Sequence, residues 1–406
     1  MLARGWQPVP VPRFEPFAAI RYAPSATLDD VSAPPYDVLS AADVDGLAEQ
    51  DPHNIVHIDV PRPADSPSRY EDAATLLRAW RADGVLVDDD RPTFTLYRMQ
   101  FTDEAGAVRH TVGVIGALEV VDLDGDGVLP HERTTPKAST DRLDLTRATN
   151  ANLSPVWGLS LTAGLTALLA DAAEPIGSCT DEAGVVHTVE RVTDPQRIAE
   201  IGAAVSANPV LIADGHHRYG ISRTYRDEVR AAQGNDSPAE LTMAYVAELV
   251  ADQLSIDAIH RTYAGVAADA LLDRLSTTFD IEPAGPVHPD FAAQTVRRGA
   301  LCFVHPNGTG SWLTPRREAF DGVRELDGAY LEHALAGFPV EVDYQHGVAE
   351  TVDLVTSGQV AAAVLIRPTS LTEIRRTADE RLLMPPKSTF FTPKLRTGLV
   401  IRTMDA

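Results

Sequence analysis

The chain alternates between two patterns of apolar residues, one typical of β-strands and the other of α-helices. Short apolar or alternating runs predict strands, the clearest at Asn54–Val60, Thr93–Phe101, Val108–Val121, Pro155–Leu161, Val210–Ala213, Leu241–Val250, Leu301–His305 and Val360–Arg367. Apolar residues at helical spacing predict helices over Ser68–Asp83, Asp194–Ser206, His217–Gln233, Ala267–Phe279 and Ser370–Thr377. We therefore expect a mixed α/β (α+β) fold, with a mixed sheet flanked by helices.

Three regions are expected along the chain, and a single interlocked unit is the alternative. Residues 1–130 are predicted to form an N-terminal α/β region and residues 131–260 a core that carries the polar motifs. Residues 261–406 are predicted to form a C-terminal α/β region, which returns a lysine-containing loop to the site. The best candidates for linkers are Glu174–His187 and Gly234–Ala239.

Composition and charge narrow the classes of partner. Hydrophobic residues make up 44% and charged residues 23% of the 406 positions, which is typical of a globular protein. A net charge of −23 disfavours binding to nucleic acids or anionic membranes. No run reaches the roughly 20 apolar residues that cross a bilayer, and the first residues do not form a secretory signal. We expect a cytoplasmic protein with a small-molecule substrate; the oligomeric state stays open.

The strongest chemical motif follows the apolar strand Val210–Ala213 and comprises Asp214, Gly215, His216, His217 and Arg218. It opens a predicted helix, whose free N–H groups and partial positive charge attract anions. Glycine allows a close approach of the backbone, and arginine can donate two hydrogen bonds to one phosphate. The motif predicts a phosphate or nucleotide site; the alternative is an Asp-Gly turn before an ordinary helix.

Two further segments carry candidate catalytic or substrate-contacting groups. His131 and Glu132 place an imidazole beside a carboxylate, which suits a general base or a metal contact. The zinc motif HExxH is incomplete, because Thr135 occupies the position of its second histidine. Arg142 and Asn152 fall on a predicted helix and just beyond it, where they either line a pocket or cap and pair the helix.

A proline-rich segment near the C-terminus, Met384–Leu395, is predicted to be a loop. Lys387, Ser388 and Thr389 are candidate contacts for a substrate or a phosphate, and Lys394 is a further cation. The same segment also suits a strap that packs its two aromatic residues on the core, and both roles are compatible.

Taken together, these segments resemble the family known as domain of unknown function 1015. The matching segments are APPYD at Ala33–Asp37, NIVHID at Asn54–Asp59, HERT at His131–Thr134, NLSPVWGL at Asn152–Leu159, DGHHRY at Asp214–Tyr219 and MPPKSTFFTPKL at Met384–Leu395. They occur in the family's order over nearly the whole chain. The family name itself implies no activity.

A second resemblance implies a chemistry. DGHHR looks like the phosphate-binding motif of the ParB/sulfiredoxin superfamily, including free serine kinases, which also carry an upstream PHE motif like Pro130–Glu132. The resemblance implies a ParB/sulfiredoxin-like core with large insertions, since the two motifs lie further apart than in the small kinases. It implies Glu132 as the base, the Asp214–Arg218 segment as the phosphate site, and ATP, ADP or pyrophosphate as the donor. Mg²⁺ would accompany a nucleotide, with Asp214 a possible contact.

The leading interpretation is thus a phosphotransferase that acts on free L-serine. A phosphatase or other hydrolase using the same anion site is one alternative, because a general base serves water as well as a hydroxyl. A non-catalytic nucleotide-binding regulatory protein is another. A P-loop enzyme is disfavoured, because the chain has no GxxxxGK[ST] motif.

Overall fold

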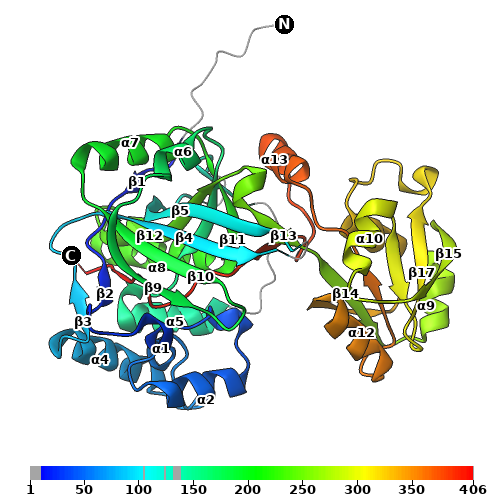
Figure 1. Ribbon diagram of the computed structural model, residues 1–406, viewed down its shortest axis with the longest axis horizontal. Helices are drawn as coiled ribbons and strands as arrows, with labels where there is room; N and C mark the ends of the chain where they lie inside the picture. Colours follow the sequence, from blue (N-terminus) through cyan, green and yellow to red (C-terminus); the bar gives the residue numbers. More distant parts are fainter. Residues whose placement is uncertain (1–10, 104–105, 123–124, 131–138, 406) are drawn as a thin grey trace, which may run out of the picture. The chain divides into compact units, whose positions relative to one another are not determined.

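Apolar strands of the chain pair into two large sheets, each at the centre of its own unit in this computed structural model (Figure 1). The structure describes residues 11–103, 106–122, 125–130 and 139–405. The first unit comprises the described residues before 256 together with 393–405, and the second comprises residues 256–392. The C-terminal segment therefore returns to the first unit. The predicted division into three regions stays a prediction.

The first unit contains a mixed sheet, as the sequence predicts. Its strands run in the order β6 (Val128–Pro130), β11 (Val210–Asp214), β8 (Val156–Ser160), β12 (Leu241–Glu248), β5 (Val108–Glu119), β4 (Phe94–Thr102), β10 (Val186–Val192) and β9 (Glu174–Thr180), with β1 (Phe14–Glu15) on β5. β11 is parallel to β6 and β12 is parallel to β8, whereas the other pairs are antiparallel. The predicted hairpin of β4 and β5 is confirmed, with Thr95 opposite Ile115.

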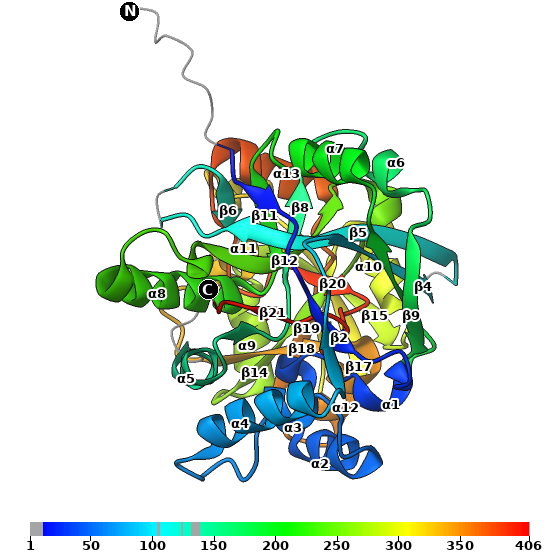
Figure 2. The ribbon, with the colours of Figure 1, turned by 90° about the vertical axis from the view of Figure 1, so that its left-hand side faces the viewer.

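The helices of the first unit pack partly on this sheet and partly in a second core with β2 and β3. They are α1 (Leu28–Val31), α2 (Ala41–Gln50), α3 (Val56–Asp59), α4 (Arg69–Ala82), α5 (Ser139–Thr149), α6 (Leu165–Leu169), α7 (Pro195–Val205) and α8 (His216–Gln233). Helices α6 and α7 bury Leu165 and Ile201 in one core with Val114 of β5 and Val246 of β12. Helix α8 packs on β8 and β12, and α5 lies between α8 and α4 (Figure 2).

Smaller elements complete the first unit. They are the pairs β2 (Ile20–Tyr22) with β3 (Leu86–Asp88) and β7 (Ala151–Asn152) with β21 (Arg402–Thr403), and the 3₁₀ turns η1 (Tyr36–Val38), η3 (Pro238–Glu240) and η4 (Ala251–Gln253). The pair of β7 with β21 ties the C-terminal segment to the first unit. In the described part of the chain, no helix is long and apolar enough to span a membrane.

The second unit has its own sheet and its own core. Its strands run in the order β15 (Phe279–Pro286), β17 (Thr309–Pro315), β16 (Leu301–Val304), β19 (Ala362–Leu365), β14 (Ile259–Ala264) and β18 (Glu341–His346). The helical elements are α9 (Ala268–Leu275), α10 (Phe291–Arg298), η5 (Arg317–Phe320), α11 (Asp327–Ala334), α12 (Val348–Thr356) and α13 (Leu371–Glu380). A short pair, β13 (Ser255–Asp257) and β20 (Phe390–Thr392), joins the beginning and the end of this unit's segment.

Two expectations from the sequence are wrong. The run Asn54–Val60 is not a strand but contains helix α3, because the Asn54 side chain accepts a hydrogen bond from the Val56 N–H (3.0 Å) and starts a helical turn. The expected linker Glu174–His187 is instead strand β9, the turn that follows it and the first two residues of the antiparallel strand β10. Its connecting turn is stabilised by the Asp181 carboxylate, which accepts hydrogen bonds from two backbone N–H groups.

Candidate functional site

The strand-to-helix junction between β11 and α8 forms as the motif predicts. β11 ends at Asp214, and Gly215 adopts the left-handed conformation (φ 82°) directly before the first residue of α8, His216. A Cβ atom at Gly215 would lie 3.1 Å from the Arg218 guanidinium, so a larger residue would crowd that side chain. The residue that precedes α8 is Gly215, which has no side chain to cap the first N–H groups of the helix, and the N-terminal end of a helix dipole is positive.

Two cations meet at the carboxylate of Asp214. Arg218 Nη2 lies 2.9 Å from Asp214 Oδ2, and Lys394 Nζ lies 3.4 Å from Asp214 Oδ1. Burial favours the neutral form of Asp214, but the charges of Lys394 and Arg218 outweigh it and hold the pKa of this carboxyl below its usual value. The ion pairs bring one cation from α8 and one from the returning C-terminal segment to the same point.

Arg218 extends from this ion pair toward the segment that precedes β8. Its Nη1 donates a hydrogen bond to the carbonyl oxygen of Pro155. Its Nε is buried and has no hydrogen-bond partner among the residues that the structure describes. Burial lowers the pKa of this guanidinium, but Asp214 and Asp37 raise it further, so Arg218 stays charged. A buried donor without a partner is costly, so an acceptor that reached Arg218 Nε would be favoured there.

The far side of Arg218 faces a small cavity that contains a second ion pair. Arg142 Nη1 lies 3.1 Å from Asp59 Oδ1, and the Arg142 guanidinium lies 4.2 Å from the centre of the Tyr36 ring. Asp59, Arg142, Tyr36 and Arg218 all line this cavity. Burial raises the pKa of Asp59, although Arg142 and Arg218 oppose the shift. Charged groups from α3, α5 and α8 thus converge within the first unit.

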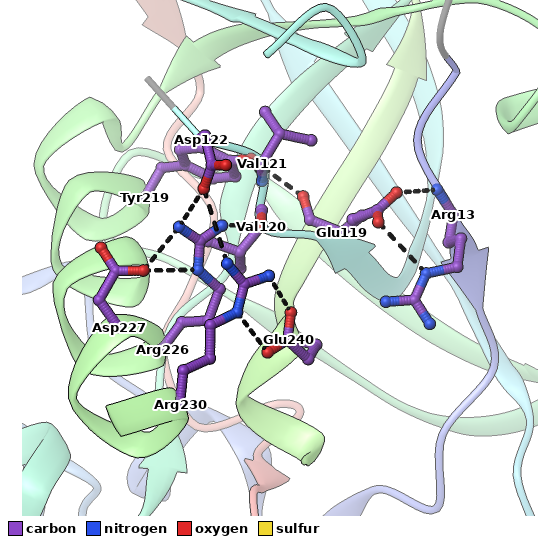
Figure 3. A network of polar contacts seen from close by, with 10 residues as sticks. All are labelled: Arg13, Glu119, Val120, Val121, Asp122, Tyr219, Arg226, Asp227, Arg230 and Glu240. Carbon is purple, nitrogen blue, oxygen red and sulfur yellow. Dashed lines mark hydrogen bonds and ion pairs between the residues drawn. The ribbon is translucent and has the colours of Figure 1, made fainter. Parts of the chain in front are cut away.

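A polar network fixes α8 to the end of β5 (Figure 3). The Arg226 side chain is almost fully buried, and its Nη1 donates to the carbonyl oxygen of Val120. The Tyr219 hydroxyl accepts from the Val121 N–H (2.8 Å) and donates to the Glu119 carbonyl oxygen (2.9 Å). Because Tyr219 directly follows Arg218 in the chain, this network fixes the backbone from which the Arg218 side chain extends.

The other predicted site residues are distributed over the chain. Asn152 lines the cavity, and its side-chain oxygen accepts from the Met243 N–H (3.0 Å) and from Arg402 (3.2 Å). His217 lies in the first turn of α8 beside His216. His131 and Glu132 lie outside the described residues.

Lys387, Ser388 and Thr389 belong to the second unit, whereas Lys394 belongs to the first. The Lys387 carbonyl oxygen accepts from Arg261 (3.1 Å), and the Ser388 hydroxyl donates to the Pro385 carbonyl oxygen (2.7 Å). The segment that the sequence presents as one loop is therefore divided between the two units.

Tyr36 and Asp59 are functional candidates that the site prediction missed. Both lie in segments that match the family, APPYD and NIVHID, so the signal was present in the motifs. Asp59 also follows the apolar residues Ile55, Val56 and Ile58, where a buried acid is unusual.

The described residues contain no preformed cluster of metal ligands. In this part of the chain, no group of three or more His, Cys, Asp or Glu side chains is arranged to hold a metal. Each oxygen of Asp214 faces a cation, so this carboxylate does not suit a divalent ion in this arrangement. The expected association of Mg²⁺ with a nucleotide stays a prediction.

Residues 14–329 match the family described as protein of unknown function, DUF1015. The chain belongs to this family. A comparison with curated proteins finds no match.

Solved structures offer distant similarities. One is a free serine kinase variant in complex with AMP, with 12% identity, a TM-score of 0.37, and coverage of 67% of this chain and 89% of that chain. Another is SbnI with a C-terminal truncation from Staphylococcus aureus, with 13% identity, a TM-score of 0.38, and coverage of 70% and 85%. A conserved hypothetical protein from Pyrococcus furiosus has 11% identity, a TM-score of 0.36, and coverage of 67% and 92%.

Proposed function

We propose that this DUF1015 protein is a small-molecule phosphotransferase that binds a nucleotide or pyrophosphate at the start of α8. The acceptor we propose is the hydroxyl of free L-serine. The observation that carries the proposal is the meeting of Arg218 and Lys394 at Asp214, beside the N-terminus of α8, whose N-cap residue is a glycine. Two cations and a helix dipole in a chain of net charge −23 make a local attraction for phosphate.

The ion pairs at Asp214 are compatible with a phosphate-binding site that contains no ligand. A donor phosphate would compete with Asp214 for Arg218 and Lys394, which the carboxylate meanwhile keeps charged and oriented. Phosphoryl transfer depends mostly on positioning and on stabilisation of charge, so such an anion site supplies much of what the reaction needs.

Glu132 is our candidate for the general base, with His131 beside it. β6 and β11 are parallel neighbours in which Pro130 lies opposite Ile212, so both strands end at the same edge of the sheet. The chain continues from Pro130 toward Glu132 and from Ile212 toward Asp214. In the proposed step, Glu132 accepts the hydroxyl proton while the hydroxyl oxygen attacks the terminal phosphorus. The bond from that phosphorus to the remainder of the donor breaks, and the donor leaves one phosphate shorter.

We also assign the motif-bearing part of the first unit to a ParB/sulfiredoxin-like core with large insertions. The support for this assignment is the order of the Pro130–Glu132 and Asp214–Arg218 motifs and the strand-to-helix junction that carries the second of them.

The test is direct detection of the product. The purified protein and its Glu132→Gln variant are incubated with L-serine, Mg²⁺ and, separately, ATP, ADP and pyrophosphate, and O-phosphoserine is measured by mass spectrometry. We expect product with the wild type and at least one donor, and little with the variant. Release of inorganic phosphate without O-phosphoserine would favour a hydrolase, and nucleotide binding without turnover would favour a regulatory protein.

A further inference from the structure

The cavity beside Arg218 presents two unsatisfied groups of opposite charge. Arg142 uses Nε for Asp141 and Nη1 for Asp59, and Asp59 uses Oδ1 for Arg142. Among the described residues, neither Arg142 Nη2 nor Asp59 Oδ2 has a hydrogen-bond partner, and neither atom is fully enclosed. The Asp59 carboxylate is almost completely buried and still has a free hydrogen-bond acceptor, and the Arg142 guanidinium beside it still has a free donor.

The size of the cavity limits what it can hold. Its free space is about 50 Å³, which is room for about four water molecules at roughly 10–15 Å³ each. Four waters occupy about 120 Å³ as a liquid, which is comparable to a small amino acid and far too little for a nucleotide. Leu145, Leu153 and Val156 form the apolar part of the wall, and a free volume this small does not accommodate a long side chain.

We propose that this cavity binds the zwitterion of a small α-amino acid, with its ammonium group on Asp59 and its carboxylate on Arg142. A purely anionic ligand would face the buried Asp59 carboxylate, and a purely cationic one would face Arg142 and Arg218, so a zwitterion is the charged ligand that complements both groups. This inference rests on the proposed function, because Arg218 lines this cavity and also belongs to the phosphate site. It assigns a specificity role to Asp59 and names the class of acceptor.

The first experiment uses the full-length wild-type protein and isothermal titration calorimetry, with and without ADP. We expect L-serine and glycine to bind more tightly than ethanolamine, which lacks the carboxylate, and than 3-hydroxypropanoate, which lacks the ammonium group. L-leucine and L-phenylalanine should not bind. Failure of the wild type to bind L-serine, or equal binding of L-leucine, would overturn the inference without any variant.

Two substitutions give a crossed pattern that a merely structural role would not produce. Asp59→Asn should weaken the binding of L-serine and ethanolamine about 10–100-fold, because a charged hydrogen bond is lost, and should not weaken 3-hydroxypropanoate, whose carboxylate the Asp59 charge repels. Arg142→Gln should weaken the binding of L-serine and 3-hydroxypropanoate and should not weaken ethanolamine. Arg147→Gln, on the exposed side of the same helix, is the matched control and should change none of them.

Circular dichroism and Tm establish that each variant is folded, and Arg142→Lys, which keeps the charge, replaces Arg142→Gln if the latter unfolds. Equal weakening of all three ligands by both substitutions would overturn the inference.

The outcomes also distinguish the inference about the cavity from the proposed function. L-serine binding with the crossed pattern but no O-phosphoserine supports the cavity and rejects the transferase. O-phosphoserine production with an unchanged KM for serine in Asp59→Asn rejects the cavity.

Discussion

At the scale of single residues, two acidic side chains pair with the cations of the candidate site. Asp214 forms ion pairs with Arg218 and Lys394, and Asp59, which lines the cavity, forms an ion pair with Arg142. Because both acids lie largely out of solvent, their interactions are screened less than surface ion pairs. Substitutions at these positions should therefore have measurable effects on binding and stability.

The pH dependence of stability reports the ion pairs of Asp214. The pKa of Asp214 lies below its usual value in the folded protein, because Lys394 and Arg218 outweigh the effect of burial. Such a group stabilises the fold above its ordinary pKa and loses this contribution as the pH falls through the folded value. We expect Asp214→Asn to be less stable than the wild type near neutral pH, with a difference that shrinks below about pH 4. Urea unfolding at a series of pH values measures it, and a difference that grows on acidification would contradict this reading.

The affinity for ADP tests the roles of the two cations, Arg218 and Lys394, directly. Arg218→Gln and Lys394→Gln should each weaken ADP binding about 10–100-fold, since each removes a charged hydrogen bond of about 1.5–3 kcal/mol. Arg223→Gln, on the same helix as Arg218, serves as the control and should leave the Kd unchanged. Calorimetry measures all three, and an unchanged Kd for Lys394→Gln would remove Lys394 from the site.

Sequence reasoning could predict the part of the site that is local in the chain. Asp214 and Arg218 are four residues apart across one strand-to-helix junction, so their contact follows from the motif. The contact of Arg142 with Asp59 spans 83 residues, and that of Lys394 with Asp214 joins α8's junction to the C-terminal segment. Neither contact is visible before the elements are packed, which is why Asp59 and Tyr36 were missed.

At the scale of elements, the predictions succeed where one periodicity persists over a long stretch. α4, α7, α8, β4 and β5 form close to their predicted bounds. α3 was missed because a short run rich in Val and Ile reads as a strand, whereas the Asn54 side chain and the surrounding helices favour a single helical turn. β9 was missed because its proline, glycine and serine residues resemble a linker.

The network that fixes α8 to β5 should contribute clearly to stability. In Arg226→Gln the buried carbonyl oxygen of Val120 loses its charged donor, which should lower the free energy of unfolding by about 2 kcal/mol. Asp227→Asn removes only an exposed partner of Arg226 and should cost much less. Chemical unfolding monitored by circular dichroism compares the two variants. Equal losses in the free energy of unfolding would show that the contact with the buried carbonyl oxygen does not account for the stabilisation by Arg226.

At the scale of the whole molecule, the two units have separate sheets and separate cores. Lys394 lies just after the point where the chain leaves the second unit, so the proposed donor site draws on the segment that returns from it. The sequence predicted the mixed α/β class, but a pattern of elements alone does not reveal which distant segments share a core.

Hydrogen exchange should show that a nucleotide protects backbone amides in the first unit and not in the second. A ligand present at about 100 times its Kd stabilises the state that binds it by about 2.7 kcal/mol. We expect ADP to slow exchange in peptides that contain the start of α8 and the segment around Lys394, and to leave β15 and β17 of the second unit unchanged. Protection confined to the second unit would contradict a donor site in the first.

Chemical labelling tests the central claim, that Lys394 and the start of α8 hold the donor phosphates, most directly. The chain has only three lysines, Lys137, Lys387 and Lys394, so an acyl-phosphate derivative of ADP or ATP that acylates nearby amines gives a simple peptide map. The account predicts an acyl group on Lys394 that excess ADP prevents and that is lost in the Arg218→Gln variant. Labelling of Lys387 without Lys394, or labelling of Lys394 that ADP does not prevent, would contradict it.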